Sequence, residues 1–283
     1  MNRKFFVVIL SSLFFACGPK LPTVNNNSSS TYKESLKRVE ESVSQEDKDA
    51  FNLSMSMLAV EQMKPYMDHG AIVSTEDEEE QARHQLHRLL HGKNYKQIIS
   101  YVDEMMISKM TNAQKQYVEV LQEEGNNLLS FGTEPQFQEL IVSQNSLTIK
   151  QATLTVKNTS KTEILALMLG AIDMSETVPF VAVTGIELNQ PLRPHESRVI
   201  TLELDPDLGW DKFITSKQQV ASAKWVVVGI EYTNGKELIN ENFLTSLDVF
   251  LQLRKNYESL LESKKDWRAA FNLDNVSKGF FPL

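Results

Sequence analysis

The chain has 283 residues and a formal net charge of −8, with 41% hydrophobic and 23% charged residues. This composition is that of a globular chain and excludes a wholly disordered one. The acidic balance argues against nucleic acid as a partner, because phosphate binding needs a basic surface. The single cysteine excludes an intrachain disulfide.

The first 16 residues have the pattern of a secretory signal peptide. Arg3 and Lys4 precede an uncharged, mostly apolar run over residues 5–16. At about 1.5 Å per residue this run spans roughly 18 Å, too short for a bilayer core of about 30 Å. It ends at Ala16, a small residue of the kind that precedes a cleavage point, and Cys17 follows directly.

The segment Phe14-Phe15-Ala16-Cys17 resembles the lipobox of bacterial lipoproteins. The resemblance implies a diacylglyceryl thioether on Cys17 and an acyl chain such as palmitate on its freed amine, which together anchor a protein to a membrane. Gly18 follows where Asp would favour the inner membrane, so the resemblance favours the outer membrane of a bacterial cell envelope. An ordinary cleaved signal or an uncleaved anchor is the alternative interpretation.

A flexible tether is predicted for residues 17–31, behind the lipidated cysteine. From Pro19 to Thr31 the chain is rich in Pro, Asn and Ser and has almost nothing to bury. Such a segment would hold a domain roughly 20 Å from the membrane.

A small helical bundle of four or five helices is predicted for residues 32–132. Ser44 and an acidic turn precede apolar residues at helical spacing. Thr75 and Glu78 fit a capping box, in which each side chain bonds to the backbone of the other residue. Gly92 is typical of the end of that helix.

The second half of this region predicts two more helices. Residues 95–106 have helical periodicity, and Thr111 is expected to cap a further helix. Residues 32–60, together with LLHGKNYKQIISYVDEM at 89–105, resemble an uncharacterised group of bacterial lipoproteins. That resemblance implies no known activity.

The segment HQLHRLLH places His84, His87 and His91 on one face of a predicted helix. Two histidines one turn apart can ligate zinc, with nitrogen ligands at about 2.0–2.1 Å. A solvated helix face, on which Glu80 supports His84, explains the same pattern. Metal binding or a pH-sensitive contact surface therefore stands as the alternative to a solvated face.

Methionines gather in the same region, with seven of the ten lying between residues 55 and 110. Methionine is flexible and polarisable, so it suits an irregular core. It equally suits an adaptable groove for a partner helix or an apolar ligand.

About seven short strands in an antiparallel sandwich are predicted for residues 133–243. Ala152, Leu154 and Val156 alternate with polar residues. A second alternating run, over residues 226–232, contains Val226, Val228, Ile230 and Tyr232. No periodic helix separates the predicted strands, and this favours antiparallel sheets over a parallel one.

Three segments of this region resemble immunoglobulin-like envelope modules. They are LTVKNTSKTEI, LRPHESRVITLEL and VVVGIEYTNGKEL, at 154–164, 192–204 and 226–238. The resemblance implies an immunoglobulin-like sandwich and a role in adhesion, spacing or protein binding, although this fold hosts many functions. His195 stands where such modules have Gly, and we interpret it as a turn residue.

Residues 244–283 predict a C-terminal helix and tail. Apolar residues repeat every three or four positions over residues 245–265, which predicts an amphipathic helix packed on the rest of the chain. Just before the last strands, Asp205, Asp207 and Asp211 lack the remaining ligands of a calcium loop, so we interpret them as turn residues.

No motif indicates catalysis: the chain has no G-x-S-x-G, H-E-x-x-H, P-loop or G-x-G turn. We therefore expect an α+β protein with a helical bundle, then an immunoglobulin-like sandwich, then an amphipathic helix. The expected function is that of a non-enzymatic, membrane-anchored envelope lipoprotein that binds an envelope protein or has a structural role, with no cofactor. The alternative is a lipoprotein that binds a metal or small ligand through the three histidines or the methionine-rich helices.

Overall fold

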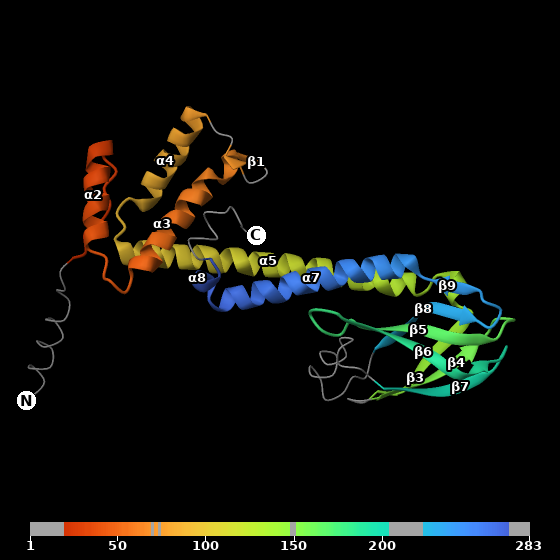
Figure 1. The fold of residues 1–283 in the computed structure, drawn as a ribbon. Coiled ribbons are helices and arrows are strands. Elements are labelled where there is room, and N and C mark those ends of the chain that lie inside the picture. The colour runs from red at the N-terminus through yellow and green to blue at the C-terminus, as the bar shows by residue number, and fades with distance from the viewer. Residues whose placement is uncertain (1–19, 69–70, 73–74, 148–150, 204–222, 272–283) are drawn as a thin grey trace, which may run out of the picture. The chain divides into compact units, whose positions relative to one another are not determined.

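The structure is a computed structural model that describes residues 20–68, 71–72, 75–147, 151–203 and 223–271 (Figure 1). The chain divides into two compact units, Met1–Thr111 with Glu262–Leu283, and Asn112–Leu261. The prediction of an α+β chain is confirmed, because the described residues form several helices and two antiparallel sheets of three and four strands. The predicted signal peptide, Cys17, the three aspartates near residue 207 and the end of the C-terminal tail lie outside the described residues.

The first unit is mainly helical. Its elements within the described residues are α2 (Ser29–Glu41), α3 (Lys48–Met63), η2 (Lys64–Tyr66), β1 (Met67–Asp68), β2 (Ala71–Ile72), α4 (Glu76–Leu90), the first part of α5 (Tyr95–Phe131), the last residues of α7 (Glu241–Lys265) and α8 (Trp267–Ala270). The capping box predicted at the start of α4 is confirmed: Thr75 N–H donates to Glu78 Oε2 at 2.8 Å, and Glu78 N–H donates to Thr75 Oγ1 at 3.3 Å. Gly92 lies just beyond this helix with a φ of +76°, as a helix-ending glycine should.

The segment before α2 differs from the predicted flexible tether. Val24 is only 1% exposed. Its N–H donates to Lys93 O at 3.0 Å, and its carbonyl accepts from Gly92 N–H at 2.8 Å. Ser28 then caps α2, four residues earlier than the predicted start of the helical region at residue 32. The polar composition hid this packing, because one buried valine and backbone hydrogen bonds hold the segment in place.

Helix α5 is one helix of 37 residues where two were predicted. Thr111 does not start a new helix, because its Oγ1 donates to Ile107 O at 2.7 Å, one turn earlier in the same helix. The helix begins after Asn94, whose side chain and that of Gln97 bond reciprocally to backbone N–H groups at 3.1 and 3.0 Å. The division between the units falls after Thr111, within α5, and not at the boundary predicted at residue 132.

The second unit contains two antiparallel sheets. One has the order β3-β4-β7, and the other has the order β6-β5-β8-β9. The bounds are β3 Leu140–Leu147, β4 Gln151–Asn158, β5 Ile164–Asp173, β6 Phe180–Leu192, β7 Ser197–Glu203, β8 Lys224–Tyr232 and β9 Glu237–Ile239, with η3 (Pro135–Phe137) before β3. The alternation predicted at residues 152–156 is confirmed, and Leu154 of β4 lies in one buried cluster with Leu167 of β5 and Tyr232 of β8.

Strand β8 differs from the predicted alternation, because it is buried on both faces. Val227 and Ile230 belong to the cluster shared by the two sheets, whereas Val226 and Val228 belong to a second cluster with α5 and α7. The pairing of β5 with β8 shifts register between Met168 and Leu169, and this inserts one extra residue into β8. The shift turns a simple alternation into a strand that contacts two cores.

The second cluster covers one end of the outer face of the four-stranded sheet. Its buried members are Leu121 and Leu128 of α5, Phe243 and Phe250 of α7, and Ile172, Val181, Val226 and Val228 of the sheet. A Cβ at Gly170 would lie 2.9 Å from Phe243 Cζ, so glycine is required for this close approach. The predicted amphipathic helix is confirmed as α7, which begins four residues earlier, where Asn240 Oδ1 accepts from Phe243 N–H at 2.9 Å.

Candidate functional site

The three predicted histidines have different surroundings. The His87 ring stacks on Tyr32 with centroids 3.5 Å apart, and the His84 ring lies edge-on to His87 at 6.2 Å. His91 is turned to the N-terminal segment, where its Nδ1 accepts from Asn26 N–H at 3.2 Å. Burial, with smaller contributions from His84 and a neighbouring arginine, lowers the pKa of His87.

No group of three or more potential metal ligands gathers anywhere in the described part of the chain. Glu80 Oε1 lies 3.5 Å from His84 Nε2, the contact expected on a solvated helix face. His84 and His87 line a polar hollow of about 730 Å³ between α4 and the N-terminal segment. The methionines contribute to the core in part, with Met57, Met106 and Met110 all at most 5% exposed.

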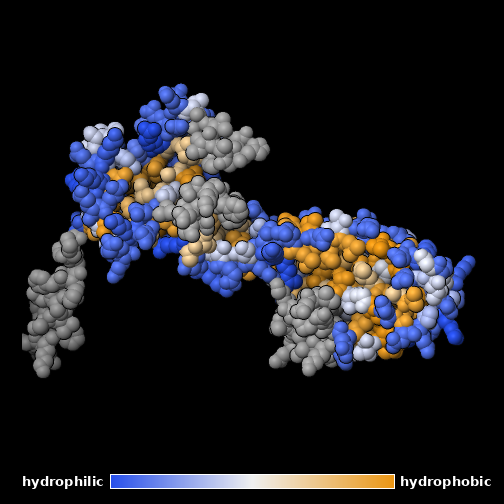
Figure 2. Space-filling view, in the orientation of Figure 1, coloured by the Kyte–Doolittle hydropathy of each residue, from blue (hydrophilic) through white to orange (hydrophobic). Residues whose placement is uncertain are grey.

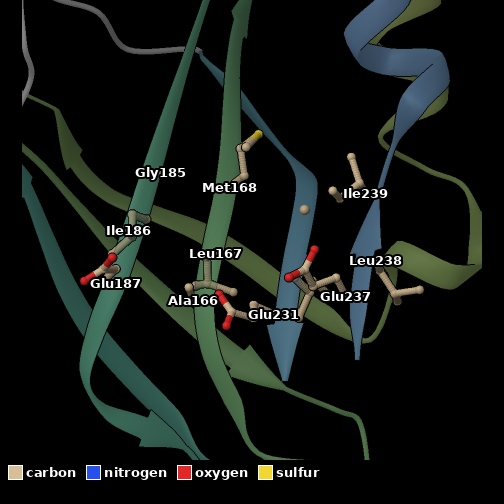
Figure 3. A pocket seen from close by; sticks show the side chains of 12 residues that line it. Ala166, Leu167, Met168, Gly185, Ile186, Glu187, Glu231, Glu237, Leu238 and Ile239 are labelled. Atoms are coloured by element: carbon tan, nitrogen blue, oxygen red, sulfur yellow. The ribbon is translucent and has the colours of Figure 1, made fainter. Parts of the chain in front are cut away.

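A groove of about 560 Å³ lies on the four-stranded sheet of the second unit, and it was not predicted from the sequence (Figure 3). The residues that line it form three rows of register partners across β6, β5, β8 and β9. The first row is Gly185, Met168, Gly229 and Ile239, the second is Ile186, Leu167, Ile230 and Leu238, and the third is Glu187, Ala166, Glu231 and Glu237.

The pleat of the strands decides which rows face outward. The second row includes Leu167 and Ile230 of the buried cluster shared by the two sheets, so it points inward. The first and third rows therefore share the opposite face, since side chains alternate along a strand. We name them the glycine row and the glutamate row.

The glycine row hollows the surface. A Cβ at Gly185 would meet no atom of the described residues within 4 Å, so these residues leave the space above this strand open. Gly229 lies more tightly, with its virtual Cβ 3.3 Å from Met168 Cβ. Apolar surface remains at the rim, where Ile239 is 46% exposed. Figure 2 shows further hydrophobic residues, in orange, on the visible surface of the strands of this unit.

The glutamate row concentrates negative charge. Glu187, Glu231 and Glu237 lie on three different strands (Figure 3), and none has an ion-pair partner within the part of the chain that the structure describes. Glu231 is the direct cross-strand neighbour of Glu237. Like charges in that position destabilise a sheet.

The sequence did contain a signal for this groove. The tripeptide Gly-Ile-Glu occurs at 185–187 and again at 229–231. Strands β6 and β8 both pair antiparallel with β5, so the two tripeptides lie in the same register on either side of it. Only the pairing reveals that this short repeat forms one surface.

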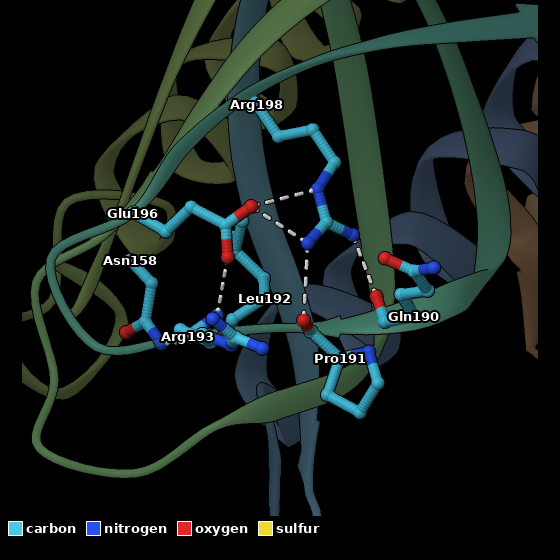
Figure 4. Close-up of polar contacts among 7 residues, drawn as sticks. All are labelled: Asn158, Gln190, Pro191, Leu192, Arg193, Glu196 and Arg198. Atoms are coloured by element: carbon cyan, nitrogen blue, oxygen red, sulfur yellow. Dashed lines mark hydrogen bonds and ion pairs between the residues drawn. The ribbon is translucent and has the colours of Figure 1, made fainter.

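Polar contacts at the corner between β6 and β7 hold the end of β6 (Figure 4). The same strand carries Gly185 and Glu187. Arg198 donates to Gln190 O at 2.6 Å and to Pro191 O at 3.0 Å, while its Nε donates to Glu196 Oε1 at 3.0 Å. The hydrogen bond from the Arg193 backbone, followed by Arg198, lowers the pKa of Glu196.

Asn158 and His195 complete the same corner. Asn158 is fully buried, and its amide donates to Thr162 O at 2.8 Å and to Leu192 O at 2.9 Å. His195 has a φ of +63°, and its N–H donates to Asn158 O at 2.9 Å. The interpretation of His195 as a turn residue is therefore confirmed: it adopts the left-handed conformation for which glycine is usual.

Comparisons with protein-family models, with curated proteins and with solved structures found no match. Among the helices of the described residues, none combines the length and hydrophobicity needed to cross a membrane.

Proposed function

We propose that the protein is a lipid-anchored, non-enzymatic component of the bacterial cell envelope that binds another protein through the groove on its four-stranded sheet. The observation that carries the proposal is the half of that sheet that no described helix covers. Helices α5 and α7 cover one end of its outer face, while the groove over the glycine and glutamate rows is lined by strand residues alone within the described part of the chain. An open, partly apolar sheet face is a surface that a partner can cover.

The order of the strands supports an immunoglobulin-like sandwich for the second unit. In the lettering of that fold, the sheets β3-β4-β7 and β6-β5-β8-β9 correspond to A-B-E and C′-C-F-G. The buried Asn158 and the turn at His195 belong to the segments that resemble such modules, and both hold the corner between β6 and β7. This fold supplies a rigid sheet for binding but does not by itself specify a partner.

The anchor proposed at Cys17 would restrict the protein to one membrane and raise the effective concentration of partners there. A clickable palmitate analogue should label the wild-type chain and leave Cys17→Ala unlabelled. Equal labelling of the two chains would remove the anchor from the proposal.

Protein binding is tested by photo-cross-linking in intact cells. A benzoylphenylalanine in place of Ile239, at the rim of the groove, should capture a specific protein that mass spectrometry identifies. The matched control carries the same group in place of Val199, which is 61% exposed on the three-stranded sheet. Filling the groove with Gly185→Trp should abolish the Ile239 cross-link. The same proteins captured at both positions, or by the filled groove, would refute binding at this surface.

A further inference from the structure

The two Gly-Ile-Glu segments break two rules of sheet stability at one place. Glycine inside a strand weakens it, yet Gly185 occupies open space where a larger residue would fit. Glu231 opposite Glu237 places like charges side by side. Features that lower folding stability without aiding packing are expected where a surface is used for binding.

The spacing of the carboxylates indicates several cations and not one metal ion. Neighbouring strands lie about 4.8 Å apart, so the Cα atoms of Glu231 and Glu237 are about 5 Å apart, and that of Glu187 lies two strands, or about 10 Å, from that of Glu231. No three of these carboxylates form a metal-binding group within the described residues. A ligand that neutralises the whole row therefore needs positive groups distributed over about 14 Å, the width of three strand intervals.

The glycine row requires a second kind of group beside those cations. It offers Met168, Ile239 and the bare backbone of two glycines, and it lies two residues, or about 7 Å, from the glutamate row. An extended chain laid across the strands, above the inward-pointing middle row, would send alternate side chains to opposite sides. One set would reach the glutamate row and the other would reach the glycine row.

We infer that the groove binds an extended segment of a partner protein in which lysine or arginine alternates with apolar residues over about five positions. This inference rests on the protein-binding function proposed above and names the chemistry of the partner. Three cations at alternate positions span about 13 Å, which matches the glutamate row. The intervening apolar side chains fill the hollow above Gly185 and contact Met168 and Ile239 beside it.

The test is fluorescence anisotropy on the Cys17→Ala chain, with a labelled heptapeptide in which lysine and valine alternate. Binding should weaken at least tenfold when Glu187, Glu231 and Glu237 are all changed to Gln, and also with Gly185→Trp. It should weaken as salt rises from 0.05 to 1 M, because the screening length falls to about 3 Å at 1 M. A peptide with glutamine in place of lysine should not bind measurably.

Matched controls separate the groove from general charge and surface effects. Replacing the exposed Glu119, Glu123 and Glu241 by Gln removes the same charge elsewhere in the second unit, and Thr201→Trp adds the same ring to the other sheet. Both control chains should bind the lysine–valine peptide like the parent chain. Equal binding by the chain with three glutamines in the groove would overturn the inference. So would displacement of the peptide by spermine at an equal concentration, because the ligand would then be a free polyamine.

The same variants separate this inference from the proposed function. If the chain with three glutamines in the groove keeps the Ile239 cross-link in cells while Gly185→Trp loses it, protein binding stands and the cationic partner is refuted. If no chain yields a specific cross-link, the proposed function fails.

Discussion

The replacement of Asn158 by Ala should strongly destabilise the second unit. The side chain makes four hydrogen bonds: its amide donates to Thr162 O and Leu192 O, and its Oδ1 accepts from the N–H and Oγ of Ser160 at 2.9 and 2.7 Å. Each buried hydrogen bond contributes about 0.5–1.5 kcal/mol, and each partner left unsatisfied costs about 1–3 kcal/mol. Some of these partners will bond to one another or to water, so we expect a loss of about 3–4 kcal/mol.

The assay is urea unfolding of the Cys17→Ala chain, followed by the fluorescence of Trp225, with Trp210 and Trp267 replaced by Phe. Trp225 lies in β8 and therefore reports on the second unit. Asn145→Ala is the matched control, because Asn145 is exposed and its side chain exchanges hydrogen bonds, among the described residues, only with Thr155. The control should lose less than about 0.5 kcal/mol. A loss below about 1 kcal/mol for Asn158→Ala would refute a stabilising role for this network.

Three further predictions concern the same unit. His195→Gly should raise the free energy of unfolding by up to about 1 kcal/mol, because the positive φ strains histidine, whereas His195→Val should lower it by about 1–2 kcal/mol. Chemical denaturation measures both changes, and a lower free energy of unfolding with Gly would contradict the assigned turn. Gly170→Ala should lower the free energy of unfolding by about 1–3 kcal/mol through the clash with Phe243, while Gly185→Ala should leave it unchanged or raise it. Thermal unfolding measures both, and equal midpoints for the two variants would contradict this difference. Because the pKa of Glu196 is lowered on folding, the stability that it contributes is present above its unfolded pKa of about 4.3 and is lost as the pH falls through the folded value. Glu196→Gln should therefore be less stable than the parent chain at pH 6 and approach it near pH 3 in parallel denaturant titrations, and a constant difference would exclude this linkage.

Local signals predicted several elements correctly. The capping box at Thr75 and Glu78, the glycine beyond α4 and the amphipathic α7 each depend on residues within a few positions of one another. Hydrogen bonds between near neighbours decide such features, so the sequence contains the needed information. Thr111 shows the limit of these signals, because its hydroxyl can either cap a helix or bond back within one.

Long-range packing explains the failures. Residues 20–31 looked like a tether because their composition is polar, and only the hydrogen bonds of Val24 with Gly92 and Lys93 bring this segment against the helical unit. Likewise, the alternating apolar residues of β8 predicted a strand that is buried on one face only. Burial on both faces requires the register shift beside β5 and the arrival of α5 and α7 on the outer face.

The histidines of α4 and the groove on the four-stranded sheet also differ in how much of each site is visible in the sequence. Three histidines at helical spacing indicated a solvated face, with a metal site or a pH-sensitive contact surface as the alternative, because this spacing places them on one side of a helix. In the structure His91 is turned to the N-terminal segment and His87 stacks on Tyr32, contacts that the helical spacing does not reveal. The groove escaped notice because its glycines and glutamates lie on three strands that are separate in the sequence.

The sequence by itself determined the α+β composition, the starts and ends of several helices and the alternation of β4, since these follow from short-range periodicity and capping. It also carried the lipobox-like Cys17, on which the proposed anchor depends. Tertiary structure alone decided that two distant Gly-Ile-Glu segments share one register and that the helices leave them uncovered. The physical reason is that strand pairing joins residues without regard to their separation along the chain, so a surface built across strands has no local signature.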